Sequence, residues 1–158
     1  MKFESLIAEF GSCYGIGDLV PDEDGVVTIR VDDRFVTFMR QGETDFVIVM
    51  AELRAASEAG EDAVNRLLMQ ANQTLFVEDG LVIVRPGESD RYCLLDRFCV
   101  TDMDFHDFDR QVGRLLSRAD SWGLFLERYV PVAAEAAATG GGSSAPSGIV
   151  AHGDMLRV

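Results

Sequence analysis

The chain has 158 residues, which is enough for one domain with a single hydrophobic core. Hydrophobic residues make up 47% of it and charged residues 26%, a composition that excludes an intrinsically disordered chain. The net charge is −13, and a field of this sign repels nucleic-acid phosphates and anionic lipid surfaces. Nucleic acid and membrane are therefore poor candidate partners, and we expect a basic or neutral protein partner.

The sequence carries no sign of export or of a membrane span. Its apolar stretches stay shorter than the ~18–20 residues that a spanning helix needs. Glu4 and Glu9 interrupt the N-terminal segment where a signal peptide would have its apolar region. The three cysteines, Cys13, Cys93 and Cys99, are too few for a disulfide framework. We expect a cytoplasmic protein with reduced thiols.

The first predicted element is an amphipathic helix. Its apolar residues recur at the spacing i, i+3, i+4 and i+7, as Phe3, Leu6, Ile7 and Phe10. Glycines follow at 11, 15 and 17 and are expected to end this helix.

Three strands are predicted next, over 26–31, 34–40 and 44–53. The first two flank Asp32-Asp33, a two-residue connection typical of a tight hairpin. Large apolar residues occupy both alternating sets of positions in the second and third strands, whereas a sheet with one face in water alternates apolar and polar residues. We therefore expect both faces of this meander to be covered, by helices of the same chain or by a partner.

A second helix is predicted over 57–71, because Val64, Leu67, Leu68 and Ala71 form an apolar stripe. Further short strands are predicted over 74–78, 81–85 and 91–100. Asp79-Gly80 is typical of a hairpin turn between the first two of these strands.

The third helix is the clearest element of the sequence. Thr101 and Asp104 match a capping box, and an apolar stripe then continues for more than five turns to Leu126. Pro131 is expected to end or kink this helix. The run 140–148 is rich in glycine and serine, so we predict one domain over 1–130 and a flexible tail over 131–158.

One acidic cluster is the best candidate for chemistry. It consists of Asp102, Asp104, His106, Asp107 and Asp109, residue types that bind hard cations, zinc or iron. On a helix these side chains spread around the cylinder, and the positive N-terminal end of the helix already explains the acids. The segment from Asp22 has valine and aspartate where a calcium loop needs glycine and glutamate. Phosphate-binding and nucleophile motifs are absent from the sequence. We expect no catalytic site, no metal and no cofactor.

The order of these elements over residues 1 to about 130 resembles the type III secretion chaperones of the Tir-chaperone family (CesT/SycE-like, class I). The N-terminal resemblance lies in Leu6-Ile7-Ala8-Glu9-Phe10, in Leu19-x-x-Asp22-Glu23-Asp24-Gly25 and in Val27-x-Ile29-x-x-Asp32. The later resemblance lies in Leu67-Leu68-x-x-Ala71-Asn72, in Leu75 with Gly80-x-Val82, and in the closing segment from Phe105 to Trp122.

The resemblance implies an α+β fold, an α/β sandwich in which a mostly antiparallel twisted sheet carries three helices in the order α-β-β-β-α-β-β-α. It implies a homodimer that holds the N-terminal chaperone-binding segment of a secreted effector and uses no nucleotide. The implied dimer interface comprises Val64, Leu67, Leu68, Ala71, Leu81 and Ile83. The implied effector-binding surface comprises Phe3, Ile7, Phe35, Phe38 and Ile48.

Two other functions stay open from the sequence. The same fold could serve a regulator that resembles the YbjN-like proteins, or an anti-activator that sequesters a transcription factor. A small metal-dependent enzyme that uses the cluster between Asp102 and Asp109 is the remaining alternative.

Overall fold

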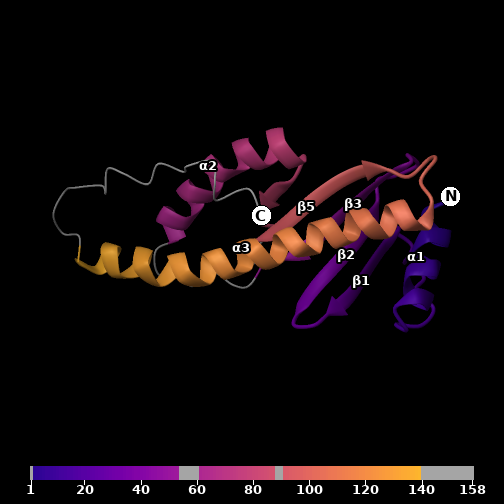
Figure 1. Cartoon of the computed structure of the whole chain (residues 1–158), viewed down its shortest axis with the longest axis horizontal. Helices are drawn as coiled ribbons and strands as arrows, with labels where there is room; N and C mark the ends of the chain where they lie inside the picture. Colours follow the sequence, from indigo (N-terminus) through magenta and orange to yellow (C-terminus); the bar gives the residue numbers. More distant parts are fainter. Residues whose placement is uncertain (1, 54–60, 88–90, 140–158) are drawn as a thin grey trace.

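The computed structural model describes residues 2–53, 61–87 and 91–139. This part of the chain contains three helices and one five-stranded sheet (Figure 1). In chain order the elements are α1 (Phe3–Cys13), β1 (Val26–Val31), β2 (Arg34–Arg40), β3 (Phe46–Glu52), α2 (Glu61–Asp79), β4 (Val82–Val84), β5 (Cys93–Cys99) and α3 (Phe105–Thr139). The predicted α+β class and the predicted order of elements are confirmed.

The strands lie in the order β1-β2-β3-β5-β4, and every neighbouring pair is antiparallel. The predicted hairpin between β1 and β2 is present, because Val31 pairs with Arg34 and Asp32 has a positive φ of 54°. After α2 the chain returns so that β5 pairs with β3 and β4 lies outside it. The sheet therefore has β1 at one edge and β4 at the other.

All three helices pack on one face of the sheet. The inward-facing strand residues are buried in a single cluster with the apolar stripes of the helices. At the centre of this cluster the ring of Phe108 on α3 lies 6.0–6.1 Å from three other phenylalanine rings, centroid to centroid. These rings are Phe10 of α1, Phe38 of β2 and Phe98 of β5. Edge-to-face and tilted aromatic pairs of this kind stabilise by about 0.5–1.5 kcal/mol beyond the area that they bury.

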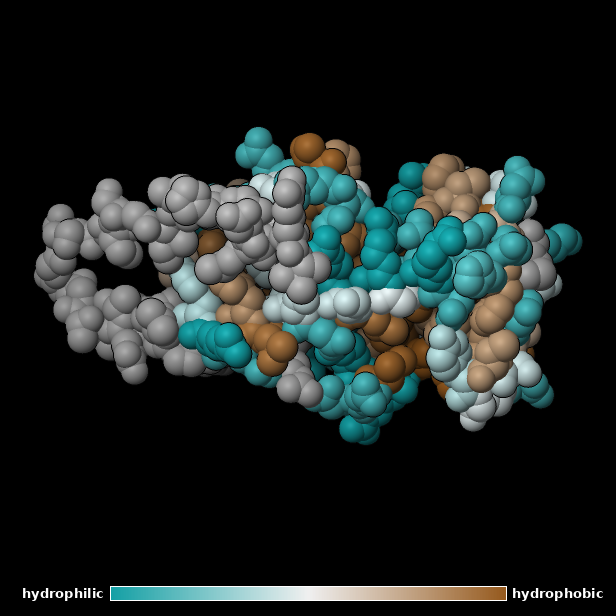
Figure 2. Space-filling view, viewed as in Figure 1, coloured by the Kyte–Doolittle hydropathy of each residue, from teal (hydrophilic) through white to brown (hydrophobic). Residues whose placement is uncertain are grey.

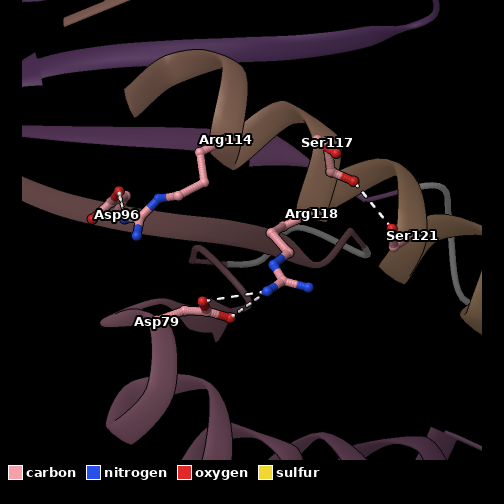
Figure 3. Close-up of polar contacts among 6 residues, drawn as sticks. All are labelled: Asp79, Asp96, Arg114, Ser117, Arg118 and Ser121. Atoms are coloured by element: carbon pink, nitrogen blue, oxygen red, sulfur yellow. Dashed lines mark hydrogen bonds and ion pairs between the residues drawn. The ribbon is translucent and has the colours of Figure 1, made fainter. Parts of the chain in front are cut away.

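Two arginines one turn apart fix α3 over the sheet and beside α2 (Figure 3). Arg114 donates to Asp96 of β5 at 3.0 Å, and Arg118 contacts Asp79 at the end of α2 at 3.3 Å. Asp96 is buried on the inner face of the sheet, where an unpaired carboxylate is strongly unfavourable. The ion pairs therefore fix the position of α3 along β5.

The opposite face of the sheet has no helix over it in the described part of the chain. Its central residues, Met39, Ile48, Met50 and Leu95, are half-buried by one another, and Phe35 stays 49% exposed. Of the two expected kinds of cover, cover by the described helices is wrong for this face, because α1, α2 and α3 all join the same core. Cover by a partner stays a prediction.

The second helix is longer than predicted, and the strand predicted over 74–78 is wrong. This segment is the last part of α2, because Leu75 extends the buried stripe of Val64 and Leu68 at helical spacing. Asp79-Gly80 ends the helix rather than making a hairpin. Gly80 has a φ of +72°, and its N–H and that of Leu81 donate to carbonyls of the last turn.

Both ends of the third helix differ from prediction. Its N-cap is Asp104, whose side chain accepts the N–H of Asp107 at 2.8 Å, whereas the hydroxyl of Thr101 donates to Asp45. The predicted capping role of Thr101 is therefore wrong. The helix continues past Pro131 to Thr139. Residues 140–158 of the predicted tail lie outside the described residues, so the domain boundary stays a prediction.

All three cysteines are free thiols, and they differ in environment. Cys13 and Cys99 are exposed, while Cys93 is buried on β5, where burial raises the pKa of its thiol to about 11. Among the described helices, none is long and apolar enough to cross a membrane.

The edge of the sheet at β4 is closed by a side chain of α2. The amide of Asn72 donates to the carbonyl oxygen of Ile83 at 2.9 Å, and the N–H of Ile83 donates back to the Asn72 side chain at 2.7 Å. Since β4 has three residues and Ile83 is the middle one, this pair of bonds occupies its outward backbone groups. No further strand can pair there without displacing Asn72.

Replacing Asn72 by alanine should therefore lower the free energy of unfolding by about 1–3 kcal/mol, because Ile83 loses both partners. Urea denaturation of the full chain measures this change. Gln73→Ala, at the exposed neighbouring position of the same helix, is the matched control and should leave the midpoint unchanged. Equal midpoints for the two variants would contradict this role of Asn72.

Candidate functional site

The edge of the sheet at β1 is open, in contrast to the edge at β4. The bond from Arg40 N–H to the Gly25 carbonyl sets the alternation, so Val26, Thr28 and Arg30 direct their backbone groups away from β2. Asp22 bonds both groups of Val26, through its side chain at 2.8 Å and its N–H at 2.9 Å. Within the described residues, nothing pairs with the outward groups of Thr28 and Arg30. Two consecutive outward positions are therefore free to accept another strand.

An apolar cleft of about 240 Å³ lies beside this open edge. It is formed where the end of α1 and the loop after it approach α3 and the end of β1. Its lining residues are Phe10, Tyr14, Ile16, Arg30, Val31, Asp109, Val112, Gly113 and Leu116. In Figure 2 apolar side chains gather in the middle of the molecule, below α3, with hydrophilic side chains below them. Tyr14 and Ile16 remain 57% and 41% exposed there.

The loop after α1 is held close to the helix by a glycine. A Cβ on Gly11 would lie 2.3 Å from the carbonyl oxygen of Gly17 and 2.9 Å from Leu19. Only glycine therefore permits this approach, which brings Tyr14 and Ile16 to the mouth of the cleft.

A hydrogen bond crosses the mouth of the cleft. The hydroxyl of Tyr14 donates to Asp109 of α3 at 2.6 Å. This bond raises the pKa of the Tyr14 phenol above its ordinary value of 10.0, and partial burial and the charge of Asp109 act in the same direction. The phenol therefore stays protonated and remains a donor at neutral pH.

A second hollow, of about 460 Å³, lies at the start of α3 and has a mixed polar and apolar lining. Its lining residues are Cys99, Thr101, Asp102, Met103, Asp107, Arg110 and Gln111. This is the region of the acidic cluster that could hold a metal. Asp104 caps the helix and Asp107 pairs with Arg110, and Asp109 accepts from Tyr14. Across the described ranges, no three histidine, cysteine or acidic side chains are arranged to hold a metal ion.

The predicted effector-binding residues divide into two groups. Phe3, Ile7 and Phe38 are buried in the core, where they could touch a partner only if the core opened. Phe35 and Ile48 lie on the uncovered face of the sheet. The contact of any of these residues with a partner stays a prediction.

The predicted dimer residues divide in the same way. Val64, Leu68, Leu81 and Ile83 are buried within the single chain, and Leu67 and Ala71 are half-buried. A different stripe of α2 is exposed, as the apolar surface over this helix in Figure 2 indicates. It consists of Met69, Phe76 and Val77, which are 76%, 64% and 76% exposed.

The cleft and the open edge were not predicted from the sequence. The residues that form them, among them Tyr14, Thr28 and Gly113, come from segments far apart in the chain. Two signals were present, namely apolar residues in the glycine-rich loop at 14–16 and a glycine inside the apolar stripe of the third helix. Neither signal gives the position of its partner segment.

Comparisons with solved structures show the same fold in proteins of low sequence identity. One chain of the ExsC–ExsE complex has a TM-score of 0.71 and 22% identity, and the match covers 80% of this chain and 97% of that one. The HopA1–SchA chaperone–effector complex gives a TM-score of 0.63 with 14% identity, and the match covers 77% of this chain and 92% of that one. The Yersinia pestis type III secretion chaperone SycH, in complex with a fragment of YscM2, gives a TM-score of 0.56 with 17% identity. This match covers 76% of this chain and 98% of that one.

No curated protein gives a significant match in sequence. The model of the Tir chaperone protein (CesT) family, in contrast, matches residues 5–123. This range runs from α1 through the sheet and most of the buried part of α3. The chain therefore belongs to the Tir chaperone protein (CesT) family, the family that its sequence resembles.

Proposed function

We propose that this secretion chaperone binds an extended segment near the N-terminus of a secreted effector by adding it as a strand to the open edge of β1. The observation that supports this most is the pairing of two features at one place. The outward backbone groups of Thr28 and Arg30 have no partner among the described residues, and the apolar cleft lies directly beside Arg30. Strand addition combines backbone hydrogen bonds with pockets for alternate side chains, and this edge offers both.

The open edge and the apolar cleft would each contribute to the free energy of effector binding. A net hydrogen bond contributes about 0.5–1.5 kcal/mol, so the few bonds to Thr28 and Arg30 give modest affinity and no sequence preference. Burial of one large apolar side chain contributes about 1.5–3 kcal/mol. The cleft would therefore supply much of the affinity and most of the selectivity, while the edge sets the register.

The solved complexes of similar fold support an effector as the partner, since one of them is a chaperone–effector complex and another contains ExsC with ExsE. The net charge of −13 favours a basic or neutral segment over an acidic one. We propose a cytoplasmic binding protein without catalysis or cofactor, with no nucleic-acid or membrane partner.

We further propose that the chain forms a homodimer through the exposed stripe of α2. Met69, Phe76 and Val77 recur at i, i+7 and i+8 on one side of this helix. Large apolar side chains that are exposed side by side on a helix commonly mark a site of protein association. The location differs from the predicted interface, because most of the predicted residues already fill the core of the single chain.

Replacing Thr28 by proline should weaken effector binding about tenfold or more, because proline removes the outward N–H that the added strand needs. The same N–H makes no bond within the described chain, so the fold should persist. Thr28→Val is the matched control. Valine keeps the N–H but, like proline, lacks the hydroxyl through which Thr28 contacts Thr37. Titration calorimetry with the N-terminal segment of a secreted protein encoded beside this chain measures both variants, and circular dichroism checks their folding. Equal affinity of the folded proline and valine variants would refute strand addition at β1.

Replacing Met69 by glutamate should convert the dimer to a monomer, because it places a charge in the apolar contact between two α2 helices. Glutamate forms helices about as well as methionine, so α2 itself should remain intact. Val20→Glu is the control, since Val20 is 77% exposed and lies outside α2. Light scattering of the full chain should show dimers for the wild type and for Val20→Glu. A dimeric Met69→Glu variant, or a monomeric wild type, would contradict a homodimer that forms through this stripe of α2.

A further inference from the structure

The exposed stripe of α2, formed by Met69, Phe76 and Val77, has no cover among the described residues. Each of these side chains is more than half exposed, although the other side of the same helix is buried in the core. Apolar side chains that are exposed side by side usually mark a contact with another segment or molecule. A segment of the same chain could make this contact before a second copy arrives.

The stripe lies within reach of the chain that follows α3. Arg118 of α3 contacts Asp79 at the end of α2, and in Figure 1 the first turns of α2 lie on the side of the last turns of α3. At about 1.5 Å per residue, Thr139 lies about 32 Å along α3 from Arg118. Met69 lies about 15 Å from Asp79 in the same direction. With the usual spacing of packed helices, Met69 is therefore about 20 Å from the end of α3.

The composition of residues 140–148 matches this distance. The run reads GGGSSAPSG. A glycine-rich chain of this length has an average end-to-end distance of about 15–18 Å and a maximum of about 30 Å. The segment 149–158 therefore begins near Met69 without full extension of the run before it. It is long enough to continue along α2 to Phe76 and Val77, which lie about 10–12 Å further along the helix.

The segment 149–158 has a composition that suits an apolar stripe. It contains one acidic and one basic side chain, so its side chains add no net charge in a chain of net charge −13. The field of the folded part therefore does not repel this segment. Its apolar residues are Ile149, Val150, Ala151, Met155, Leu156 and Val158.

We propose that the segment 149–158 folds back onto the exposed stripe of α2 in the same chain and competes there with a second copy. The apolar residues at its start cover Met69, and those at its end cover Phe76 and Val77. Two copies associate only when both have released the segment, so the segment sets the concentration at which dimers form. The competition rests on the proposed homodimer, whereas the cover within one chain does not.

Charges placed among the apolar residues of the segment test the proposal. The double variant Val150→Glu/Leu156→Glu, made in the full chain, should release the segment from the stripe, because a buried unpaired carboxylate is unfavourable. Ser143→Glu/Ser147→Glu adds the same two charges to the glycine-rich run and is the matched control. Light scattering over a dilution series measures the dimer dissociation constant of the wild type and of both variants.

We expect Val150→Glu/Leu156→Glu to dimerise about tenfold to a hundredfold more tightly than the wild type and the control. This range corresponds to a segment that covers the stripe for about two thirds to nine tenths of the time, because both copies must release it. Equal dissociation constants of the three proteins would overturn the competition.

Oxidation of Met69 by hydrogen peroxide, followed by peptide mass spectrometry, tests the cover without a dimer. Each protein is diluted until it is monomeric. Met69 should oxidise about threefold to tenfold more slowly in the wild type and the control than in Val150→Glu/Leu156→Glu. Met39, on the uncovered face of the sheet, should oxidise at one rate in all three proteins.

The two measurements separate the cover from the homodimer. One oxidation rate for Met69 in all three proteins would overturn the cover, and the competition with it, even if dimers form. Slower oxidation of Met69 in a wild type that never dimerises would support the cover and overturn the homodimer alone.

Discussion

The contact of Phe108 with three other phenylalanine rings determines the layout of the molecule. Because Phe10, Phe38 and Phe98 meet it on the same side of the sheet, α1 and α3 must both cover that side. Burial of the four rings and the surrounding aliphatic residues is the main driving force for this arrangement. The opposite face of the sheet and the edge at β1 are left without cover from the described helices. Phe10 also lines the cleft, so the same cluster that holds the core forms the inner wall of the binding site.

The two edges of the sheet differ in whether their outward backbone groups are already hydrogen-bonded. At β4 the side chain of Asn72 occupies the outward backbone groups of Ile83, which prevents pairing with another chain. At β1 Asp22 caps the first outward residue, and none of the described residues bonds the outward backbone groups of the next two. An exposed edge strand is a hazard for aggregation unless it has a partner. In a chaperone of secreted proteins, an open edge beside an apolar cleft has the properties that an extended client segment requires.

Much of the fold was predictable from local pattern, and the site was not. The first two strands match their predicted ranges because apolar alternation and the Asp32-Asp33 turn are local signals. The strand predicted over 74–78 was wrong because a short run of β-branched and aromatic residues fits a strand as well as a helix. Packing of Leu75 against the core makes this segment part of α2. Strand order, the edge at β4 and the cleft depend on pairings between distant segments. The hydrogen bond between Tyr14 and Asp109, 95 residues apart, is one such pairing, and periodicity in one sequence carries no signal for it.

Amide hydrogen exchange at β1 tests the central claim, strand addition to the open edge, most directly. The measurement compares the free full-length chain with its complex with the N-terminal segment of the secreted partner. The N–H groups of Val27 and Ile29 point toward β2 and should be protected in both states. Those of Thr28 and Arg30 should exchange quickly in the free chain and become protected in the complex. A complex that forms with the same affinity while the Thr28 and Arg30 amides continue to exchange quickly would contradict the account.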